Sequence, residues 1–86
     1  MDIDTLLDFT VTSKASDLHL SAGLAPLFRI DGELCSFNYP VLAHQDVAEM
    51  IDSIMNDRQR THYKEQLETD FSFERKQLAR FRVNVL

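Results

Sequence analysis

The C-terminal stretch TDFSFERKQLARFRVNVL, residues 69–86, decides the fold of this chain. Apolar and polar residues alternate in its two halves, and a polar connection separates them. The apolar positions are Phe71, Phe73, Phe81, Val83 and Val85. A period of two predicts two strands, each with one buried and one open face. The buried face supplies an aromatic core, and the open face presents Arg80 and Arg82, about 7 Å apart along their strand.

The open face of this hairpin allows two interpretations. It is a solvated face of an antiparallel sheet, or it binds an anion or a protein partner. The sequence also stops at Leu86 inside the alternating pattern, without a turn or a polar tail. Because an unpaired strand edge promotes association, we expect residues 1–86 to be one domain of a longer protein, with the final strand at an open edge.

Length and composition indicate a cytoplasmic globular domain. The chain has 86 residues, of which 44% are hydrophobic, so it can bury a modest core without a metal or disulfides. It has no apolar run of about 18 residues, as a membrane span requires. The N-terminal residues MDIDTLLDF lack the basic start and long apolar segment of a signal peptide. Cys35 is the single cysteine, which excludes an internal disulfide.

Charge is distributed unevenly along the chain. Residues 1–57 hold ten acidic and two basic side chains, a net of −8, whereas residues 58–86 hold four acidic and seven basic ones, a net of +3. The total of −5 argues against nucleic acid as a partner, because binding without sequence preference needs a clustered basic face. The split suggests complementary surfaces that dock on another domain or copy, or a chance clustering of helix charges.

The rest of the chain predicts an α+β fold. Apolar residues recur at helical spacing in residues 2–15 and 41–56, and a weaker helix is expected at 58–68. Strands are expected at 17–21, 27–30 and 33–37, and Asp31-Gly32 predicts a two-residue hairpin turn. Asn56 with Gln59 resembles a capping box, and Tyr63 with Leu67 supplies a thin apolar face to the last helix. The order α-β-β-β-α-α-β-β favours a mostly antiparallel sheet with helices on one face.

Several kinds of chemistry are absent from the sequence. A phosphate-binding loop needs two nearby glycines and a lysine, and this chain contains only Gly23 and Gly32. The three histidines lie far apart in different elements, so no metal site is expected. Cys35 is expected to be a buried structural thiol rather than a nucleophile.

The remaining candidates for a binding site are mostly arginines, namely Arg29, Asp31, Arg80, Arg82 and Asn84. Arg29 and Asp31 are two positions apart and are expected to share a face, where they form an internal ion pair or contribute to a site. Guanidinium groups are suited to phosphate because they stay charged and match its oxygens with two donors. Residue chemistry alone therefore predicts an α+β domain with an arginine-bearing face.

Four stretches resemble a known family: ASDLHLSAGLAPLFRIDGEL, IMNDRQR, LETDFSFE and ARFRVN, which begin at residues 15, 54, 67 and 79. In this order they are similar to the N-terminal domain of the PilT-type ATPases. These are the type IV pilus retraction, or twitching motility, motors of the type II/IV secretion ATPase superfamily. The likeness runs from residue 2 to residue 85. The segment ERKQLARF departs from it, because it replaces a glycine-containing turn.

The resemblance implies a PAS-like fold for residues 1–86 and an assembly role in a cytoplasmic homohexamer at the inner membrane. ATP and Mg²⁺ would bind between this domain and a C-terminal RecA-like domain that carries the Walker motifs and is absent here. This chain alone would not be an enzyme, whereas the parent protein would couple ATP hydrolysis to pilus disassembly by the machinery at the pilus base.

The family pattern also implies roles for individual residues. Arg82 is the best match to the arginine that approaches the nucleotide phosphates, and Arg80 is second; both are assigned a catalytic role. Asp31, in the R-x-D-G pattern, and Arg29 are assigned to nucleotide binding. The alternative is a self-standing PAS-like module that senses a ligand or binds a protein, and a plain adaptor without a ligand is a third possibility.

Overall fold

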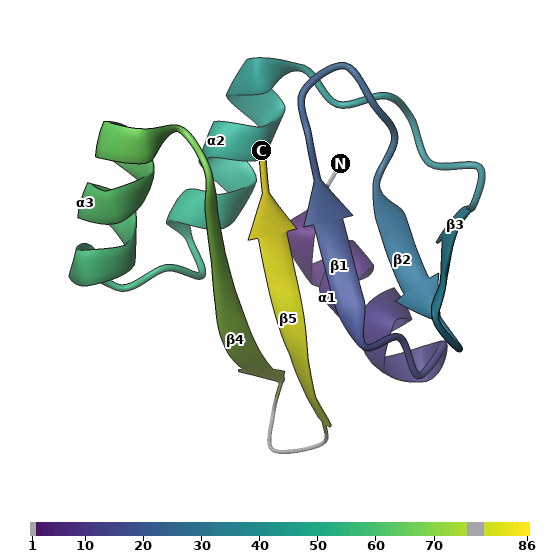
Figure 1. Cartoon of the computed structure of the whole chain (residues 1–86). Coiled ribbons are helices and arrows are strands. Elements are labelled where there is room, and N and C mark those ends of the chain that lie inside the picture. The colour runs from purple at the N-terminus through teal and green to yellow at the C-terminus, as the bar shows by residue number, and fades with distance from the viewer. Residues whose placement is uncertain (1, 76–78) are drawn as a thin grey trace.

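A five-stranded sheet with three helices forms the molecule (Figure 1). The computed structural model describes residues 2–75 and 79–86. The helices are α1 (Ile3–Thr12), α2 (His44–Asp52) and α3 (Asp57–Gln66). The strands are β1 (Asp17–Leu20), β2 (Leu27–Ile30), β3 (Glu33–Ser36), β4 (Thr69–Arg75) and β5 (Ala79–Val85). The predicted α+β class and the order of the elements are confirmed.

The strands lie in the order β3-β2-β1-β5-β4. Three neighbouring pairs are antiparallel, but β1 and β5 are parallel, so the sheet is mixed. The parallel pair arises because the chain passes through α2 and α3 before β5 returns beside β1 (Figure 1). The final strand is therefore an inner strand, paired on both sides, and the prediction that it forms an open edge is wrong. The edge strands are β3 and β4.

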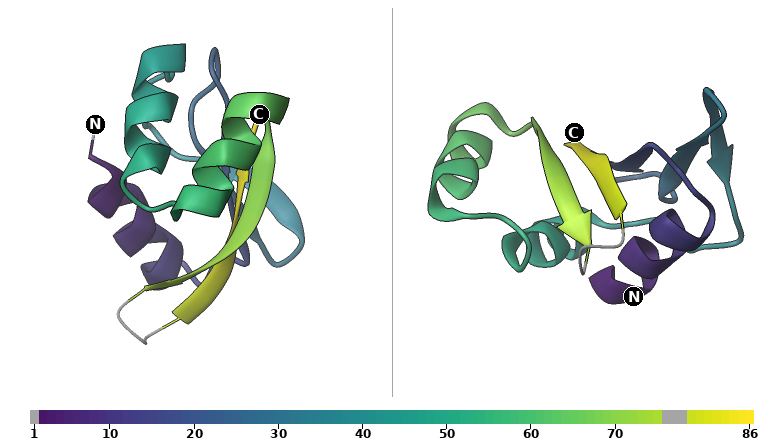
Figure 2. Two further views of the ribbon diagram at one scale, coloured as in Figure 1. Left: turned by 90° about the vertical axis from the view of Figure 1, so that its left-hand side faces the viewer. Right: turned by 90° about the horizontal axis from the view of Figure 1, so that it is seen from below.

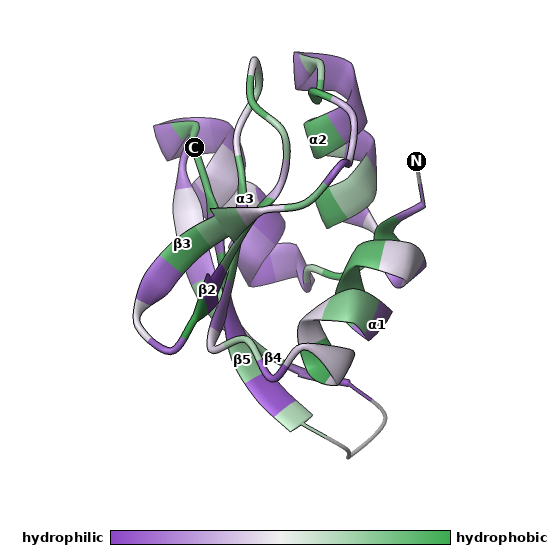
Figure 3. Ribbon diagram, turned by 90° about the vertical axis from the view of Figure 1, so that its right-hand side faces the viewer, coloured by the Kyte–Doolittle hydropathy of each residue, from purple (hydrophilic) through white to green (hydrophobic). Residues whose placement is uncertain are grey.

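The core lies between the sheet and helices α1 and α2, which pack on one of its faces (Figures 2 and 3). Alternation places the apolar residues of the central strands on this face, as predicted. The buried sheet residues are Leu18, Leu20, Phe28, Phe71, Phe81, Val83 and Val85. Helices α1 and α2 add Leu6, Leu7, Val47, Met50 and Ile51. The opposite face of β1 and β5 carries no helix and holds the polar side chains.

Two helices are shorter than the sequence predicts. Helix α1 ends at Thr12 because Lys14 has a φ of +59°, a left-handed conformation that stops a helix. Helix α2 begins at His44 rather than at residue 41. Leu42 cannot join it, because its backbone is hydrogen-bonded to the preceding loop: its N–H donates to Leu24 O (3.0 Å), and its carbonyl accepts from Gly23 N–H (2.8 Å).

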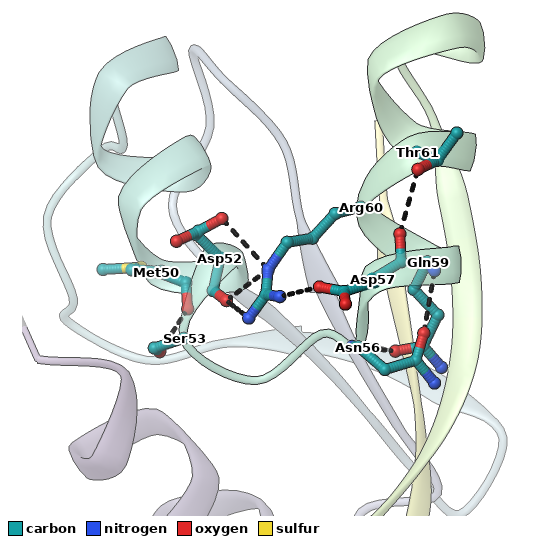
Figure 4. A network of polar contacts seen from close by, with 8 residues as sticks. All are labelled: Met50, Asp52, Ser53, Asn56, Asp57, Gln59, Arg60 and Thr61. Atoms are coloured by element: carbon teal, nitrogen blue, oxygen red, sulfur yellow. Dashed lines mark hydrogen bonds and ion pairs between the residues drawn. The ribbon is translucent and has the colours of Figure 1, made fainter.

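The turns and caps follow the sequence with one exception. Asp31 and Gly32 have φ of +52° and +85°, as a primed hairpin turn requires. The capping box is confirmed: Gln59 N–H donates to Asn56 Oδ1 (2.8 Å), and Asn56 N–H donates to Gln59 Oε1 (2.9 Å) (Figure 4). Leu67, however, does not extend the apolar face of α3, since it is the left-handed C-terminal cap and is 66% exposed.

Two further predictions concern β3 and the hairpin connection. Cys35 is only half-buried, and its Sγ–H donates to Glu33 O (3.6 Å), so the expectation of a buried thiol is wrong. The reason is that β3 is an edge strand whose residues are mostly exposed. The departure from the family pattern, ERKQLARF, spans residues 74–81, and its middle residues 76–78 lie outside the described residues.

Candidate functional site

The polar face of the sheet carries a row of three charged side chains from three adjacent strands. Asp17 on β1 lies directly opposite Arg29 of β2 on one side and opposite Arg82 of β5 on the other. All three side chains project from the face opposite the helices, because the neighbouring residues Leu18 and Val83 are buried in the core. We call Arg29, Asp17 and Arg82 the Arg–Asp–Arg row.

Asp17 is the centre of the polar contacts in this row. Its side chain is only 14% exposed. Ser16 Oγ donates to Oδ2 (2.6 Å), and Asn84 Nδ2 donates to Oδ1 (3.4 Å). Arg29 Nε lies 3.7 Å from Oδ2, and Arg82 Nε lies 3.9 Å from Oδ1. Each carboxylate oxygen therefore faces one arginine and one hydrogen-bond donor.

The arginines of this face differ in how firmly they are held. Arg29 Nη1 donates to Gly32 O (3.0 Å), which ties its guanidinium to the β2–β3 turn. The Arg82 side chain is 60% exposed, and its shortest contact to Asp17 is at Nε (3.9 Å). Arg80 lies opposite Glu74 in the β4–β5 register and is exposed. Across residues 2–75 and 79–86, the terminal nitrogens of Arg82 make no hydrogen bond, so they can meet an anion from solvent.

An open hollow of about 550 Å³ lies over this face. Its lining consists of Ser16, Asp17, His19, Arg29, Ser72, Arg80, Phe81, Arg82 and Asn84. Four of the five candidates from the sequence, Arg29, Arg80, Arg82 and Asn84, are thus brought together, and three of these are among the four residues that the family resemblance assigns a role. Asp31 is not among the lining residues, because it occupies the hairpin turn. Arg29 pairs with Asp17 rather than with Asp31, so the expected internal pair has a different acidic partner.

His19 lies in the same hollow and is neutral at neutral pH. Burial lowers the pKa of its imidazole below the ordinary value of 6.5; Asp17 opposes this shift, while Arg29 and Arg82 reinforce it. Its Nε2 atom is buried and has no hydrogen-bond partner among the described residues. The imidazole therefore adds no positive charge to the hollow at neutral pH, and the positive charge of the hollow comes from its arginines.

The face is suited to binding an anion. Guanidinium groups offer paired N–H donors that match phosphate oxygens. Within the part of the chain that the structure describes, His, Cys, Asp and Glu side chains form no group that could hold a metal ion.

No helix in residues 2–75 or 79–86 is long and apolar enough to cross a membrane.

Sequence reasoning missed the acidic centre of the site. The alternation in DLHLS already places Asp17 and His19 opposite Leu18 and Leu20. What the sequence lacks is any sign that β1 pairs with both β2 and β5, which is the fact that brings Asp17 between two arginines.

A second hollow, of about 330 Å³, lies between α2 and α3. Its apolar lining includes Ile51, Met55 and Tyr63. Arg60 of α3 links the two helices beside it, because its Nη2 donates to Asp52 O at the end of α2 (2.9 Å), while its Nη1 donates within α3 to Asp57 Oδ1 (2.9 Å) (Figure 4). These contacts fix α3 next to α2, which explains the position of a helix that has no buried residue of its own.

Comparison with known proteins gives a consistent picture. The chain is 56% identical to the type IV pilus retraction ATPase PilT of Pseudomonas aeruginosa over 98% of its length, and 46% identical to a twitching motility protein of Neisseria gonorrhoeae over 69%. It spans 24% and 16% of these proteins, respectively. No family model matches the chain.

A solved structure agrees with the sequence comparison. The fold superimposes on a crystal structure of the pilus retraction motor PilT with bound ADP at a TM-score of 0.73 and 32% identity. The match covers 95% of this chain and 24% of that one. High identity along nearly the whole chain, together with the shared fold, shows that the chain belongs to the PilT-type pilus retraction ATPases and corresponds to their N-terminal domain.

Proposed function

We propose that residues 1–86 form the nucleotide-clamping and assembly domain of a longer ATPase that couples ATP hydrolysis to pilus disassembly. The observation that carries this proposal is the exposed Arg82 guanidinium at the end of the Arg–Asp–Arg row, whose shortest contact to Asp17 is at Nε (3.9 Å). The relatives named above are a pilus retraction ATPase and an ADP-bound retraction motor, which supports a nucleotide as the anion.

Hydrolysis is assigned to a part of the protein outside this chain. The chain spans 24% of the length of its Pseudomonas relative and contains no phosphate-binding loop. A C-terminal RecA-like domain would hold ATP and Mg²⁺, and this domain would close over the bound nucleotide. In that arrangement Arg82 is the main contact to the phosphates, and Arg80 is the second. Arg29 also binds on the phosphate side of the nucleotide, and Asp31, in the exposed turn, is assigned to the nucleoside side.

The proposed role of Arg82 is electrostatic. Negative charge spreads over the oxygens of a phosphoryl group during transfer, and a positioned guanidinium stabilises it. Because Nε already faces Asp17, the two terminal nitrogens remain to form a pair of hydrogen bonds with phosphate oxygens. An arginine that is already oriented loses little conformational freedom when the nucleotide arrives.

The proposal extends to assembly and location. The partners are the RecA-like domain of the same protein, neighbouring subunits of a homohexamer and the pilus base machinery, with no nucleic acid. The protein would work in the cytoplasm at the periphery of the inner membrane. The alternative, a PAS-like sensing or interaction module, is supported by the apolar hollow between α2 and α3.

The test is Arg82→Ala in the full-length protein. We expect ATPase turnover to fall more than tenfold, a loss above about 1.4 kcal/mol of transition-state stabilisation. Arg80→Ala should lose less, and Arg82→Lys should recover little activity because lysine lacks the paired donors. The matched control is Arg58→Ala, which removes an exposed arginine from α3, away from the hollow.

Stability is measured in parallel to separate catalysis from folding. In the 86-residue chain, Arg82→Ala should change the free energy of unfolding by less than about 0.5 kcal/mol, as expected for an exposed side chain. Near-normal turnover of the full-length Arg82→Ala protein would contradict the proposed function. It would favour the sensing or interaction module instead.

A further inference from the structure

We propose that Asp17 is the positioning residue of the Arg–Asp–Arg row: its carboxylate fixes the direction of Arg82, and of Arg29 beside it, so that both guanidinium groups meet one anion. This inference rests on the proposed function, because it names the residue through which Arg82 is oriented. Asp17 touches neither nucleotide nor metal in this scheme and acts only through the arginines.

The first step of the argument is the spacing of the strands. Adjacent strands lie about 4.8 Å apart, so the backbones of Arg29 and Arg82, separated by β1, lie about 9.6 Å apart. Two guanidinium groups at this spacing repel one another; Arg29 is also held by Gly32 O, whereas the Arg82 guanidinium makes no hydrogen bond among the described residues. Asp17 is directly between them and within 3.7 and 3.9 Å of their Nε atoms, so it attracts both toward the centre of the row.

The second step is that Asp17 itself is held in place. Its side chain is 14% exposed, and it accepts hydrogen bonds from Ser16 Oγ (2.6 Å) and Asn84 Nδ2 (3.4 Å). These donors come from the two sides of the carboxylate, one on each oxygen. A carboxylate held by neutral donors offers a fixed point for the guanidinium of Arg82, whose side chain is 60% exposed.

The third step concerns which nitrogen Asp17 faces. Its shortest contact to each arginine is at Nε, 3.7 Å for Arg29 and 3.9 Å for Arg82. A carboxylate on the terminal nitrogens would compete with phosphate oxygens for the same donors. Contact at Nε orients the guanidinium plane and leaves the outer edge of Arg82 available, which is the geometry that a positioning residue needs.

The proposal predicts a characteristic kinetic signature for Asp17→Asn in the full-length protein. The substitution keeps the size of the side chain but removes a negative charge from an anion site. The KM for ATP should therefore not rise, whereas kcat should fall about tenfold, because a misdirected guanidinium stabilises the transition state poorly. A residue that only bound substrate would give the opposite pattern.

The decisive experiment is a double-substitution cycle of Asp17→Asn and Arg82→Ala. If Asp17 acts through Arg82, Asp17→Asn should lower kcat about tenfold in the wild-type background but less than about twofold when Arg82 is already alanine. The matched control is Asp70→Asn, which removes one negative charge from an exposed position on the same face, outside the Arg–Asp–Arg row. It should leave kcat unchanged.

Each result has a defined meaning. Equal losses from Asp17→Asn in both backgrounds would show a merely structural role and would overturn the inference, as would wild-type kcat in Asp17→Asn. Near-normal turnover in Arg82→Ala alone would instead refute the proposed function. If Asp17→Asn does not fold, Ser16→Ala replaces it in the cycle, because it frees the carboxylate without changing charge. A loss of kcat that depends on Arg82 supports the inference, and one that does not overturns it.

Discussion

Asp17 and His19 project from the same face of β1 into the same hollow, but they differ in their contacts. The Asp17 carboxylate accepts two hydrogen bonds and lies beside two arginines. His19 is partly buried beside positive charge, which lowers the pKa of its imidazole below 6.5. The strand thus supplies one carboxylate and one imidazole to the hollow, and the imidazole resists protonation as the pH falls below 6.5.

His19 should make the stability of the 86-residue chain depend on pH. Below pH 6.5 the unfolded chain binds a proton on His19 that the folded chain resists, because burial lowers the folded pKa. The free energy of unfolding should therefore fall as the pH drops from 6.5 toward the folded pKa. In His19→Gln this part of the slope should disappear, as urea unfolding at several pH values between about 5 and 7.5 would measure.

The control for this effect is His62→Gln, which makes the same substitution at an exposed position on α3. It leaves the partly buried imidazole of His19 in place, so the part of the slope that His19 contributes should remain. If His19→Gln kept the wild-type slope below pH 6.5, the imidazole would be solvated in the folded state and its burial would not influence stability.

The arginines of the site could be predicted from the sequence, whereas their acidic partner could not. Arg80 and Arg82 follow from alternation with Phe81 and Val83, a local pattern. Pairing of Arg29 depends on the strand opposite it. Asp31 lies two positions from Arg29 but occupies a turn with positive φ. The contact to Arg29 is made instead by Asp17, which lies opposite Arg29 in the β1–β2 register.

At the scale of the elements, α3 shows how a helix with little burial is held. It has a capping box at its start and contacts through Arg60 to the end of α2 (Figure 4). The helix begins where the sequence predicts because the capping signal is local. The sequence pattern places the start of α2 at residue 41, before the observed start at His44. The reason is that Leu42 is held by hydrogen bonds to a loop that is distant in sequence.

The C-terminal cap of α3 offers a stabilising substitution. Leu67 adopts φ of +59° and ψ of +16°, which costs a non-glycine residue about 1 kcal/mol. Its side chain is 66% exposed, so removing it sacrifices little burial. Leu67→Gly should therefore raise the free energy of unfolding by up to about 1 kcal/mol, a gain that thermal melting of the 86-residue chain would detect.

Leu24→Gly is the matched control for this substitution. Leu24 is 53% exposed and is not among the described residues with positive φ. The same change there should bring no gain, because glycine only adds freedom to the unfolded chain. A lower melting temperature for Leu67→Gly would show that the exposed leucine contributes more through contacts than its backbone conformation costs.

At the scale of the whole molecule, the strand order explains what sequence patterns could not supply. Alternation identifies strands and faces, but it does not say which strands are neighbours. The parallel pairing of β1 with β5 places the C-terminal strand in the middle of the sheet. It also assembles the Arg–Asp–Arg row from segments near both ends of the chain, so the site exists only in the complete fold.

Ion pairs within the fold connect the acidic and the basic part of the chain. Arg75 on β4, from the basic part of the sequence, reaches α1 in the acidic part: Nη1 lies 3.0 Å from Asp4 Oδ1, and Nη2 lies 3.0 Å from Asp8 Oδ1. Arg60 similarly meets Asp52. The two oppositely charged halves are thus joined by ion pairs inside the domain, which accounts for part of the split without a second molecule.

Arg75→Gln should therefore destabilise the 86-residue chain in a salt-dependent way. Arg75 is 14% exposed and contacts two carboxylates, so we expect a loss of about 1 kcal/mol in the free energy of unfolding at low ionic strength. At about 1 M salt the screening length is about 3 Å, and the difference from the wild type should shrink by about half.

The control is Arg58→Gln, which replaces an exposed arginine that has no ion pair among the described residues. It should cost little stability at either salt concentration. Urea unfolding at both ionic strengths measures the difference in the free energy of unfolding between each variant and the wild type. A loss that stays constant with salt would mean that Arg75 stabilises the fold by packing its aliphatic stem between β4 and α1, and that the charge split has no role in joining the two halves.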